Sequence, residues 1–97
     1  MVRKEVLETA LSCVDGGREQ DYGKPEDNFG TIASLWSTYL GYHVTSKDVA
    51  AMMILEKISR IMSGHAKDDN WVDIAGYAAC GGEIESTVTI TKNGESK

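Results

Sequence analysis

Apolar side chains recur at i, i+3, i+4 and i+7 in two stretches of the first half of the chain, which is the spacing of amphipathic helices. The first stretch covers about residues 4–15, and Gly16-Gly17 ends it because glycine inside a helix costs about 1 kcal/mol relative to alanine. The second begins at Pro25, which suits the first position of a helix, and ends before Gly41. Both stretches are therefore predicted to be helices.

The second half of the chain contains two further helical stretches. The sequence TSKD at residues 45–48 resembles a capping box with aspartate in place of the usual glutamate, and it predicts a third helix to about residue 63. A fourth helix is expected from Asp68 or Asp69 to about residue 85. Together the four stretches predict an all-α, four-helix bundle-like fold.

The character of the sequence changes near its end. The stretch TVTITKNGESK, residues 87–97, alternates briefly as a β-strand would and then becomes polar. A single strand without a partner is not stable, so we expect a short irregular or mobile tail there. The predicted organisation is one helical domain over residues 1–86, followed by this tail.

The third predicted helix is apolar on nearly every side and contains a continuous apolar run from Val49 to Leu55. A helix of this kind needs packing partners on more than one side, either in the core or in an oligomer. We therefore expect self-association, most simply as a homodimer. The same run is far shorter than the ~20 residues that span a bilayer, so no membrane partner is expected.

Composition and charge limit the classes of partner. The chain has 97 residues, 41% of them hydrophobic, which fits one small globular domain. The N-terminal sequence MVRKEVLETA lacks the apolar core of a signal peptide, so we expect a cytoplasmic protein. A formal net charge of −5 argues against generic nucleic-acid binding, but not against a small anion held through a divalent cation. Cys13 and Cys80 lack CxxC spacing and are expected to be free, buried thiols.

Acidic residues gather in the segment KDDNWVDIAGYAA, residues 67–79. Asp69 and Asp73 stand one turn apart on one face of the predicted fourth helix. Two interpretations are open: the acids cap and solvate the start of the helix, or they hold a metal ion. Capping explains Asp69 well but Asp73 less well, because Asp73 lies between Val72 and Ile74 in a segment with little polar surface.

Glu56 on the third predicted helix adds a carboxylate that could face Asp73 across the fold. Burying two unpaired carboxylates together is costly, and either a metal cation or the side chains of Lys57 and Arg60 would remove that cost. Glu56 and Arg60, one turn apart, alternatively form an ordinary ion pair within their helix. Mg²⁺ favours carboxylate oxygens completed by waters and substrate phosphates, which makes Glu56, Asp69 and Asp73 the candidate metal ligands.

Three further side chains are candidates for contacts with a base or a sugar. Tyr22 precedes a turn at Gly23, Asn28 stands at the start of the second predicted helix, and Trp71 lies among the acids. The alternative is that Tyr22 belongs only to a turn and covers the end of the bundle. His65 is expected to be a loop residue rather than a ligand.

Three segments, YGKPEDNFGTIASLW, MMILEKISRI and KDDNWVDIAGYAACGG, resemble an uncharacterised protein family encoded by phages and prophages, over roughly residues 18–84. More distantly, their order is similar to that of the MazG-like all-α nucleotide pyrophosphohydrolases and of a nucleotide-modification-associated phage domain. In MazG-like proteins an ExxE pair and an ExxD pair on successive helices hold Mg²⁺ against the phosphates of an NTP, which water cleaves to NMP and pyrophosphate. The resemblance therefore implies a MazG-like arrangement of helices and Mg²⁺ as the cofactor.

The match to these motifs is partial. Glu56 corresponds to the first acid of ExxE and Asp73 to the last acid of ExxD, whereas Ser59 and Asn70 stand where the other acids would be. Fewer carboxylates hold a metal more weakly, and a basic pair can bind phosphate but cannot lower the pKa of an attacking water as a metal does. The departures therefore favour nucleotide binding over hydrolysis.

The leading hypothesis is a nucleotide- or phosphate-binding protein, with Mg²⁺-dependent NTP pyrophosphohydrolase activity as its extension. Glu56 and Asp73 would then be the catalytic carboxylates. The predicted substrate contacts are Lys57, Arg60, Tyr22, Asn28 and Trp71. The alternative is a non-catalytic, oligomeric helical interaction module in which the acids cap helices and the apolar third helix forms the interface.

Overall fold

The computed structural model of the protein describes residues 1–15, 25–64 and 67–91. These residues form four α-helices and no β-strand. The helices are α1 (Arg3–Val14), α3 (Pro25–Leu40), α4 (Ser46–Met62) and α5 (Asp68–Thr91). The all-α prediction is confirmed, and α1, α3 and α4 begin and end close to the predicted positions.

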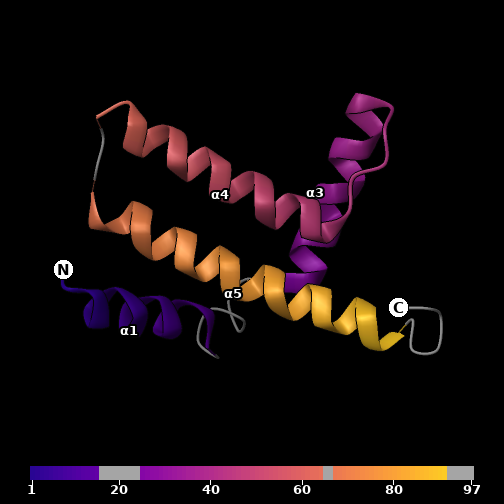
Figure 1. Cartoon of the computed structure of the whole chain (residues 1–97). Helices are drawn as coiled ribbons and strands as arrows, with labels where there is room; N and C mark the ends of the chain where they lie inside the picture. The colour runs from indigo at the N-terminus through magenta and orange to yellow at the C-terminus, as the bar shows by residue number, and fades with distance from the viewer. Residues whose placement is uncertain (16–24, 65–66, 92–97) are drawn as a thin grey trace.

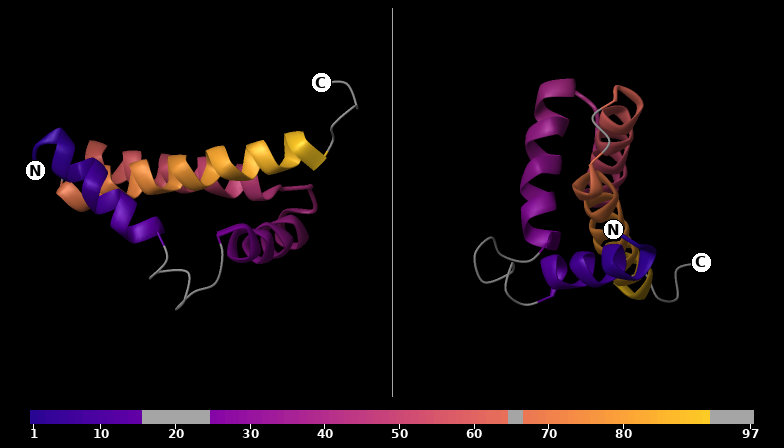
Figure 2. Two further views of the ribbon diagram at one scale, coloured as in Figure 1. Left: turned by 90° about the horizontal axis from the view of Figure 1, so that it is seen from below. Right: turned by 90° about the vertical axis from the view of Figure 1, so that its left-hand side faces the viewer.

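Two antiparallel helices, α4 and α5, form the centre of the molecule and lie side by side (Figure 1). Helix α1 packs against the N-terminal part of α5, on the side away from α4 (Figures 1 and 2). Helix α3 crosses the α4–α5 pair steeply at the other end of the molecule, so the arrangement is bundle-like without one common axis (Figure 2). One consequence is that the C-terminal turns of α3 extend past the edge of α4 (Figure 1).

The start of α4 is fixed by the predicted capping box. Thr45 Oγ1 accepts a hydrogen bond from the backbone N–H of Asp48 at 3.1 Å, and Asp48 Oδ2 accepts one from the backbone N–H of Thr45 at 2.9 Å. These bonds satisfy two backbone donors that a helix start leaves without partners. The backbone N–H of Thr45 stabilises the charged carboxylate and lowers the pKa of Asp48.

The core lies where α3 crosses the central pair. Val49 is fully buried, and the ring of Phe29 from α3 packs against that of Tyr77 from α5, with centroids 6.0 Å apart. A Cβ added to Gly81 of α5 would lie 3.1 Å from the Cβ of Ala50, so these two small residues allow α4 and α5 to approach closely. The buried core residues are Phe29, Ala33, Val44, Val49, Ala50, Cys80 and Ile84.

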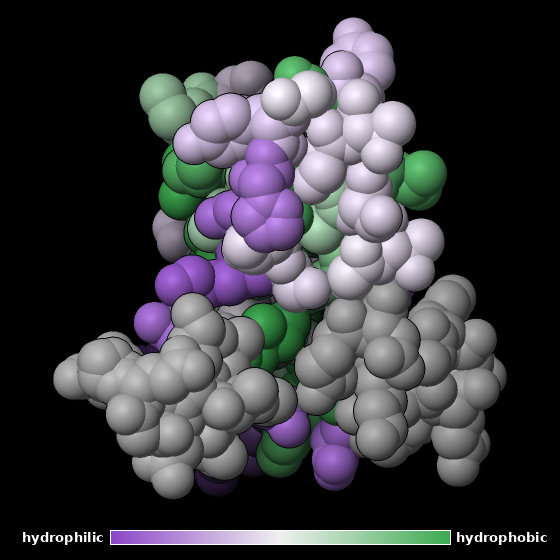
Figure 3. All heavy atoms as spheres, turned by 90° about the vertical axis from the view of Figure 1, so that its right-hand side faces the viewer, coloured by the Kyte–Doolittle hydropathy of each residue, from purple (hydrophilic) through white to green (hydrophobic). Residues whose placement is uncertain are grey.

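The two cysteines are free thiols, as predicted. Cys80 is buried in the core, also as predicted, whereas Cys13 is only half-buried. Seen from the end that carries α3, the upper part of the molecule shows polar and weakly polar side chains over its middle and apolar side chains at its edges, and further apolar side chains lie lower down at the centre (Figure 3). Among the helices in the described part of the chain, none has both the length and the apolar character needed to cross a membrane.

The predicted end of the last helix, at about residue 85, is wrong. Helix α5 continues to Thr91, so residues 87–91 are helical rather than part of an irregular tail. Residues 87–91 are all β-branched, and each costs only a few tenths of a kcal/mol in a helix. Extending a helix that has already formed adds one backbone hydrogen bond per residue, which offsets that cost. Residues 92–97 lie outside the described part of the chain.

Candidate functional site

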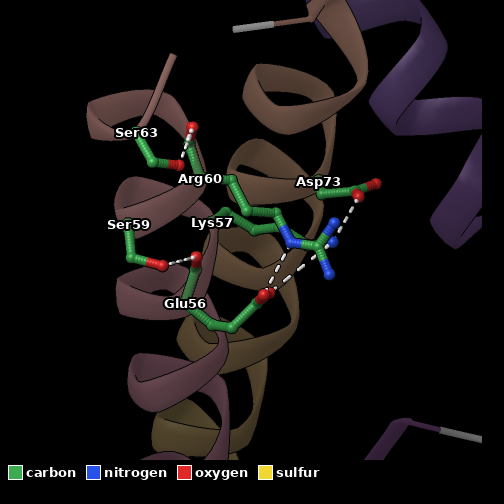
Figure 4. Close-up of polar contacts among 6 residues, drawn as sticks. All are labelled: Glu56, Lys57, Ser59, Arg60, Ser63 and Asp73. Atoms are coloured by element: carbon green, nitrogen blue, oxygen red, sulfur yellow. Dashed lines mark hydrogen bonds and ion pairs between the residues drawn. The ribbon is translucent and has the colours of Figure 1, made fainter. Parts of the chain in front are cut away.

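Four charged side chains meet between α4 and α5, and we call them the charge cluster: Glu56, Lys57 and Arg60 of α4 with Asp73 of α5 (Figure 4). Lys57 lies between the two carboxylates. Its Nζ atom is 3.1 Å from Asp73 Oδ2 and 3.8 Å from Glu56 Oε1. Glu56 and Asp73 therefore do face each other across the central helix pair, as the sequence hypothesis supposed.

The second cation of the charge cluster is Arg60, one turn after Glu56. Its Nε donates a hydrogen bond to Glu56 Oε2 at 2.6 Å, which is the predicted ion pair within α4. This hydrogen bond lowers the pKa of the Glu56 carboxyl, and the nearby charges of Arg60 and Lys57 lower it further. The same bond raises the pKa of Arg60, and the carboxylate of Asp73 adds to that effect.

The charge cluster thus contains two carboxylates and two cations, so its formal charge is zero. Only 15% of the Lys57 side chain is exposed, compared with 41% for both Glu56 and Asp73. The Lys57 side chain is therefore the most buried member, while the carboxylates and Arg60 are more exposed. Lys57 and Arg60 thus neutralise the facing carboxylates of Glu56 and Asp73 in this structure.

Two serines of α4 lie near the charge cluster in sequence but turn away from it (Figure 4). Ser59 Oγ donates to the backbone carbonyl of Glu56 at 2.7 Å, and Ser63 Oγ donates to that of Arg60 at 3.1 Å. Both hydroxyls are thus bonded to their own helix. Ser59, which the predicted resemblance places where an ExxE pair would have its second acid, contributes no side-chain contact to the charge cluster.

Other predicted site residues lie apart from the charge cluster. Asp69 is exposed in the first turn of α5, and in the described residues no three His, Cys, Asp or Glu side chains come close enough to hold a metal ion. Trp71 is exposed and lies two residues before Asp73, so it projects from a different side of α5. Asn28 is exposed in α3. Tyr22 and His65 fall outside the described residues.

Asn70 is a polar residue whose position the sequence hypothesis did not anticipate. It is the one buried polar or charged residue of the described chain. Asn70, Asp73 and Tyr77 recur at i, i+3 and i+7, which places all three on the side of α5 that faces its neighbours. That spacing was the available signal, because a polar residue in register with core positions is expected to be buried.

Comparisons with known proteins identify a family and relatives. A family model described as a domain of unknown function, DUF6378, matches residues 5–85. The Gene 55 protein of Mycobacterium phage L5 is 49% identical over 74 residues, and that of Mycobacterium phage D29 is 42% identical over 77 residues. These matches cover 75% and 79% of this chain but 47% and 51% of the two relatives, so the chain spans about half their length. No solved structure matches the chain.

These matches confirm the predicted resemblance to a phage-encoded family. The more distant resemblance to MazG-like pyrophosphohydrolases stays a prediction. All four residues of the charge cluster lie within residues 5–85, which the family model matches.

Proposed function

The chain belongs to the DUF6378 family, and we propose that it binds the phosphate groups of a nucleotide at the charge cluster. The observation that supports this proposal is the convergence of two carboxylates and two cations from facing helices, with Lys57 within 4 Å of both Glu56 and Asp73. Buried or half-buried charges are an expensive way to join two helices, since apolar side chains of similar size serve as well or better. A ligand-binding role explains why such a group stands there.

Phosphate binding would use the two cations. Arg60 is exposed, and its bond to Glu56 uses only Nε, one of the five N–H donors of a guanidinium group. Planar guanidinium groups bind phosphate oxygens in pairs, whereas Lys57 would act as a single positive charge. On binding, Arg60 would use its remaining N–H donors, and Lys57 would exchange a carboxylate oxygen for a phosphate oxygen.

Charge balance predicts that Mg²⁺ accompanies the nucleotide. The charge cluster is neutral by itself, so a bound phosphate adds uncompensated negative charge next to Glu56 and Asp73. Mg²⁺ is commonly held by one or two carboxylates together with substrate phosphates, and these two residues fit that donor set. Asp69, the third predicted ligand, would have to reach the cluster from one turn away, so we assign it a secondary place.

Hydrolysis is the extension of this proposal. When bound, Mg²⁺ would neutralise phosphate charge and lower the pKa of an attacking water. The carboxylate of Glu56 or Asp73 would accept the proton of that water as a general base. The reaction class we propose is cleavage of an NTP to NMP and pyrophosphate, which follows from the sequence resemblance and not from the charge cluster.

Thermal unfolding of the chain with non-hydrolysable nucleotides, with and without Mg²⁺, tests the proposal. A ligand at 100 times its Kd adds about 2.7 kcal/mol to the stability of the folded state, and this raises Tm by several degrees for a domain of this size. We expect a shift that is largest with nucleotide and Mg²⁺ together, and that is lost in Asp73→Asn and in Lys57→Met. Each variant is compared with its own Tm without ligand.

A matched control exists at the other end of the same helix pair. Lys47 of α4 forms an exposed ion pair with Glu85 of α5 at 3.6 Å, outside the charge cluster. Lys47→Met removes the same charge from the same helix and should keep the full ligand-induced shift. The absence of any shift in the wild-type chain, or an equal shift in Lys57→Met and Lys47→Met, would refute nucleotide binding at the charge cluster.

The second candidate function is a non-catalytic, oligomeric helical interaction module. The observation that favours it is the exposure of large apolar side chains on the outer side of α4, among them Leu55 and Met62. On this account the charge cluster only joins α4 to α5, and nucleotides leave Tm unchanged.

A further inference from the structure

The side of α4 that faces solvent carries a regular apolar stripe, which we call the α4 seam: Ala51, Leu55, Ile58 and Met62. All four residues are exposed, with 62% of Leu55 and 82% of Met62 accessible. Their spacing is four, three and four residues. Apolar residues at alternating intervals of three and four are the a and d positions with which one helix packs along another.

The α4 seam is distinct from the face that α4 uses within the chain. The core-facing residues of α4 include Val49, Ala50 and Met53. At 100° per residue, Ala51, Leu55 and their companions lie on the opposite side of the helix. In the described chain this side has no helix against it, since α5 and α3 both contact the core-facing side (Figure 1).

The α4 seam ends in a corner formed with α3. Leu40 continues the core stripe of Phe29, Ala33 and Trp36 along α3 at helical spacing, yet 55% of it is exposed. The reason is the steep crossing of α3, whose C-terminal turns extend past α4 (Figure 1). The last turn of α3, which carries Leu40, therefore exposes apolar surface beyond the edge of α4 (Figure 1).

We propose that a second copy of this chain covers the α4 seam, with the two α4 helices antiparallel about a twofold axis. In this pairing Ala51 lies opposite Met62 of the second copy, and Leu55 lies opposite Ile58 of the second copy. The smallest seam residue thus meets the longest one, and two branched side chains of equal size meet at the centre. This fit of the seam to itself identifies a second copy, rather than an unrelated helix, as the occupant.

Charge and position agree with the same pairing. The α4 seam contains no Asp, Glu, Lys or Arg, so its burial leaves no unpaired charge, as in the centre of a stable interface. The antiparallel arrangement also brings the C-terminal end of the second α4 toward the C-terminal turns of α3. An isolated pairing of two helices is a small interface compared with the ~800 Å² per partner of stable dimers, and this corner extends it.

The dimer can be tested independently of nucleotide binding, because Glu56 and Arg60 project from other sides of α4 than the seam. Sedimentation equilibrium of the chain over a range of concentrations should give twice the mass of one chain. Leu55→Glu places a charge in the centre of the seam and should weaken the dimer by at least ~100-fold. Leu7→Glu is the matched control, since Leu7 is an equally exposed leucine on α1, and it should leave the dimer unchanged.

A pair of uncharged variants tests the antiparallel pairing and does not depend on how Leu55→Glu folds. Ala51→Met puts two large side chains opposite each other and Met62→Ala puts two small ones, so each should weaken the dimer. The double variant restores one small and one large residue at each position and should dimerise more tightly than either single variant. A monomeric wild-type chain, a dimer unaffected by Leu55→Glu, or a double variant no tighter than the single ones would overturn the proposal.

Discussion

Replacing Lys57 by methionine removes the positive charge between Glu56 and Asp73 while keeping a straight side chain in the same space. The Lys57 ammonium and the Asp73 carboxylate are 3.1 Å apart. At this distance the Coulomb attraction is about 1.3 kcal/mol in water and about 5 kcal/mol at an effective dielectric constant of 20. The true coupling lies toward the lower figure, because 41% of Asp73 is exposed and both ions lose solvation on pairing.

We therefore expect a coupling free energy of about 1 kcal/mol between Lys57 and Asp73. A double-mutant cycle with Lys57→Met, Asp73→Asn and the double variant measures it from urea unfolding at pH 7. Lys57→Met alone should lower the free energy of unfolding, since it leaves two facing carboxylates without their shared cation. Asp73→Asn in the same background should recover part of that loss.

The Lys47–Glu85 pair provides the comparison for this cycle. It also joins α4 to α5, but its atoms are 3.6 Å apart and more than half of each side chain is exposed. Exposed pairs of this kind contribute about 0–1 kcal/mol, commonly too little to measure. A coupling between Lys57 and Asp73 no larger than that between Lys47 and Glu85 would refute the reasoning that burial of Lys57 strengthens the charge cluster.

Three further predictions concern the scaffold. Gly82→Ala should raise the free energy of unfolding by about 0.5–1 kcal/mol, whereas Gly81→Ala should not, because its added Cβ would meet Ala50. Urea unfolding of both variants measures this difference, and equal gains in stability would contradict the close approach of α4 and α5. Thr45→Ala should lower the free energy of unfolding by about 1 kcal/mol and Tm by several degrees, because it removes the cap of α4. Thr38→Ala should cost little, because the Thr38 hydroxyl donates to the carbonyl of Ser34 within its own helix. A similar loss in both variants would argue against the cap. Folding lowers the pKa values of Glu56 and Asp48, so the stability that these carboxylates contribute is complete above their unfolded pKa values and is lost as the pH falls through their folded pKa values. The free energy of unfolding, measured from pH 7 to 3, should therefore fall below pH ~4.5, and it should fall less steeply in Glu56→Gln.

The helices were predictable because their signals are local. Pro25 and Gly41 bound α3, and the capping box at Thr45 and Asp48 begins α4, each through chemistry confined to a few residues. The end of α5 was not predictable in this way. Its β-branched residues favour a strand when considered alone, and only the preceding helix and the lack of a strand partner decide the outcome.

The charge cluster was predictable in its members but not in its geometry. Helical spacing places Glu56 and Asp73 on particular faces of α4 and α5, but the sequence does not state how the two helices are aligned. That alignment depends on close packing, such as that of Gly81 against Ala50, and it determines that Lys57 lies between the carboxylates. The steep crossing of α3 is likewise a result of long-range packing, and no local pattern predicts it.

Amide chemical-shift mapping on the isotopically labelled chain tests nucleotide binding at the charge cluster most directly. Non-hydrolysable nucleotide with Mg²⁺ would be titrated into the wild-type chain and into Lys57→Met. Our account predicts saturable shifts concentrated at residues 56–60 of α4 and 70–77 of α5, and their loss in Lys57→Met. Shifts confined to α1 or to the α4 seam, or no shifts at all, would contradict it.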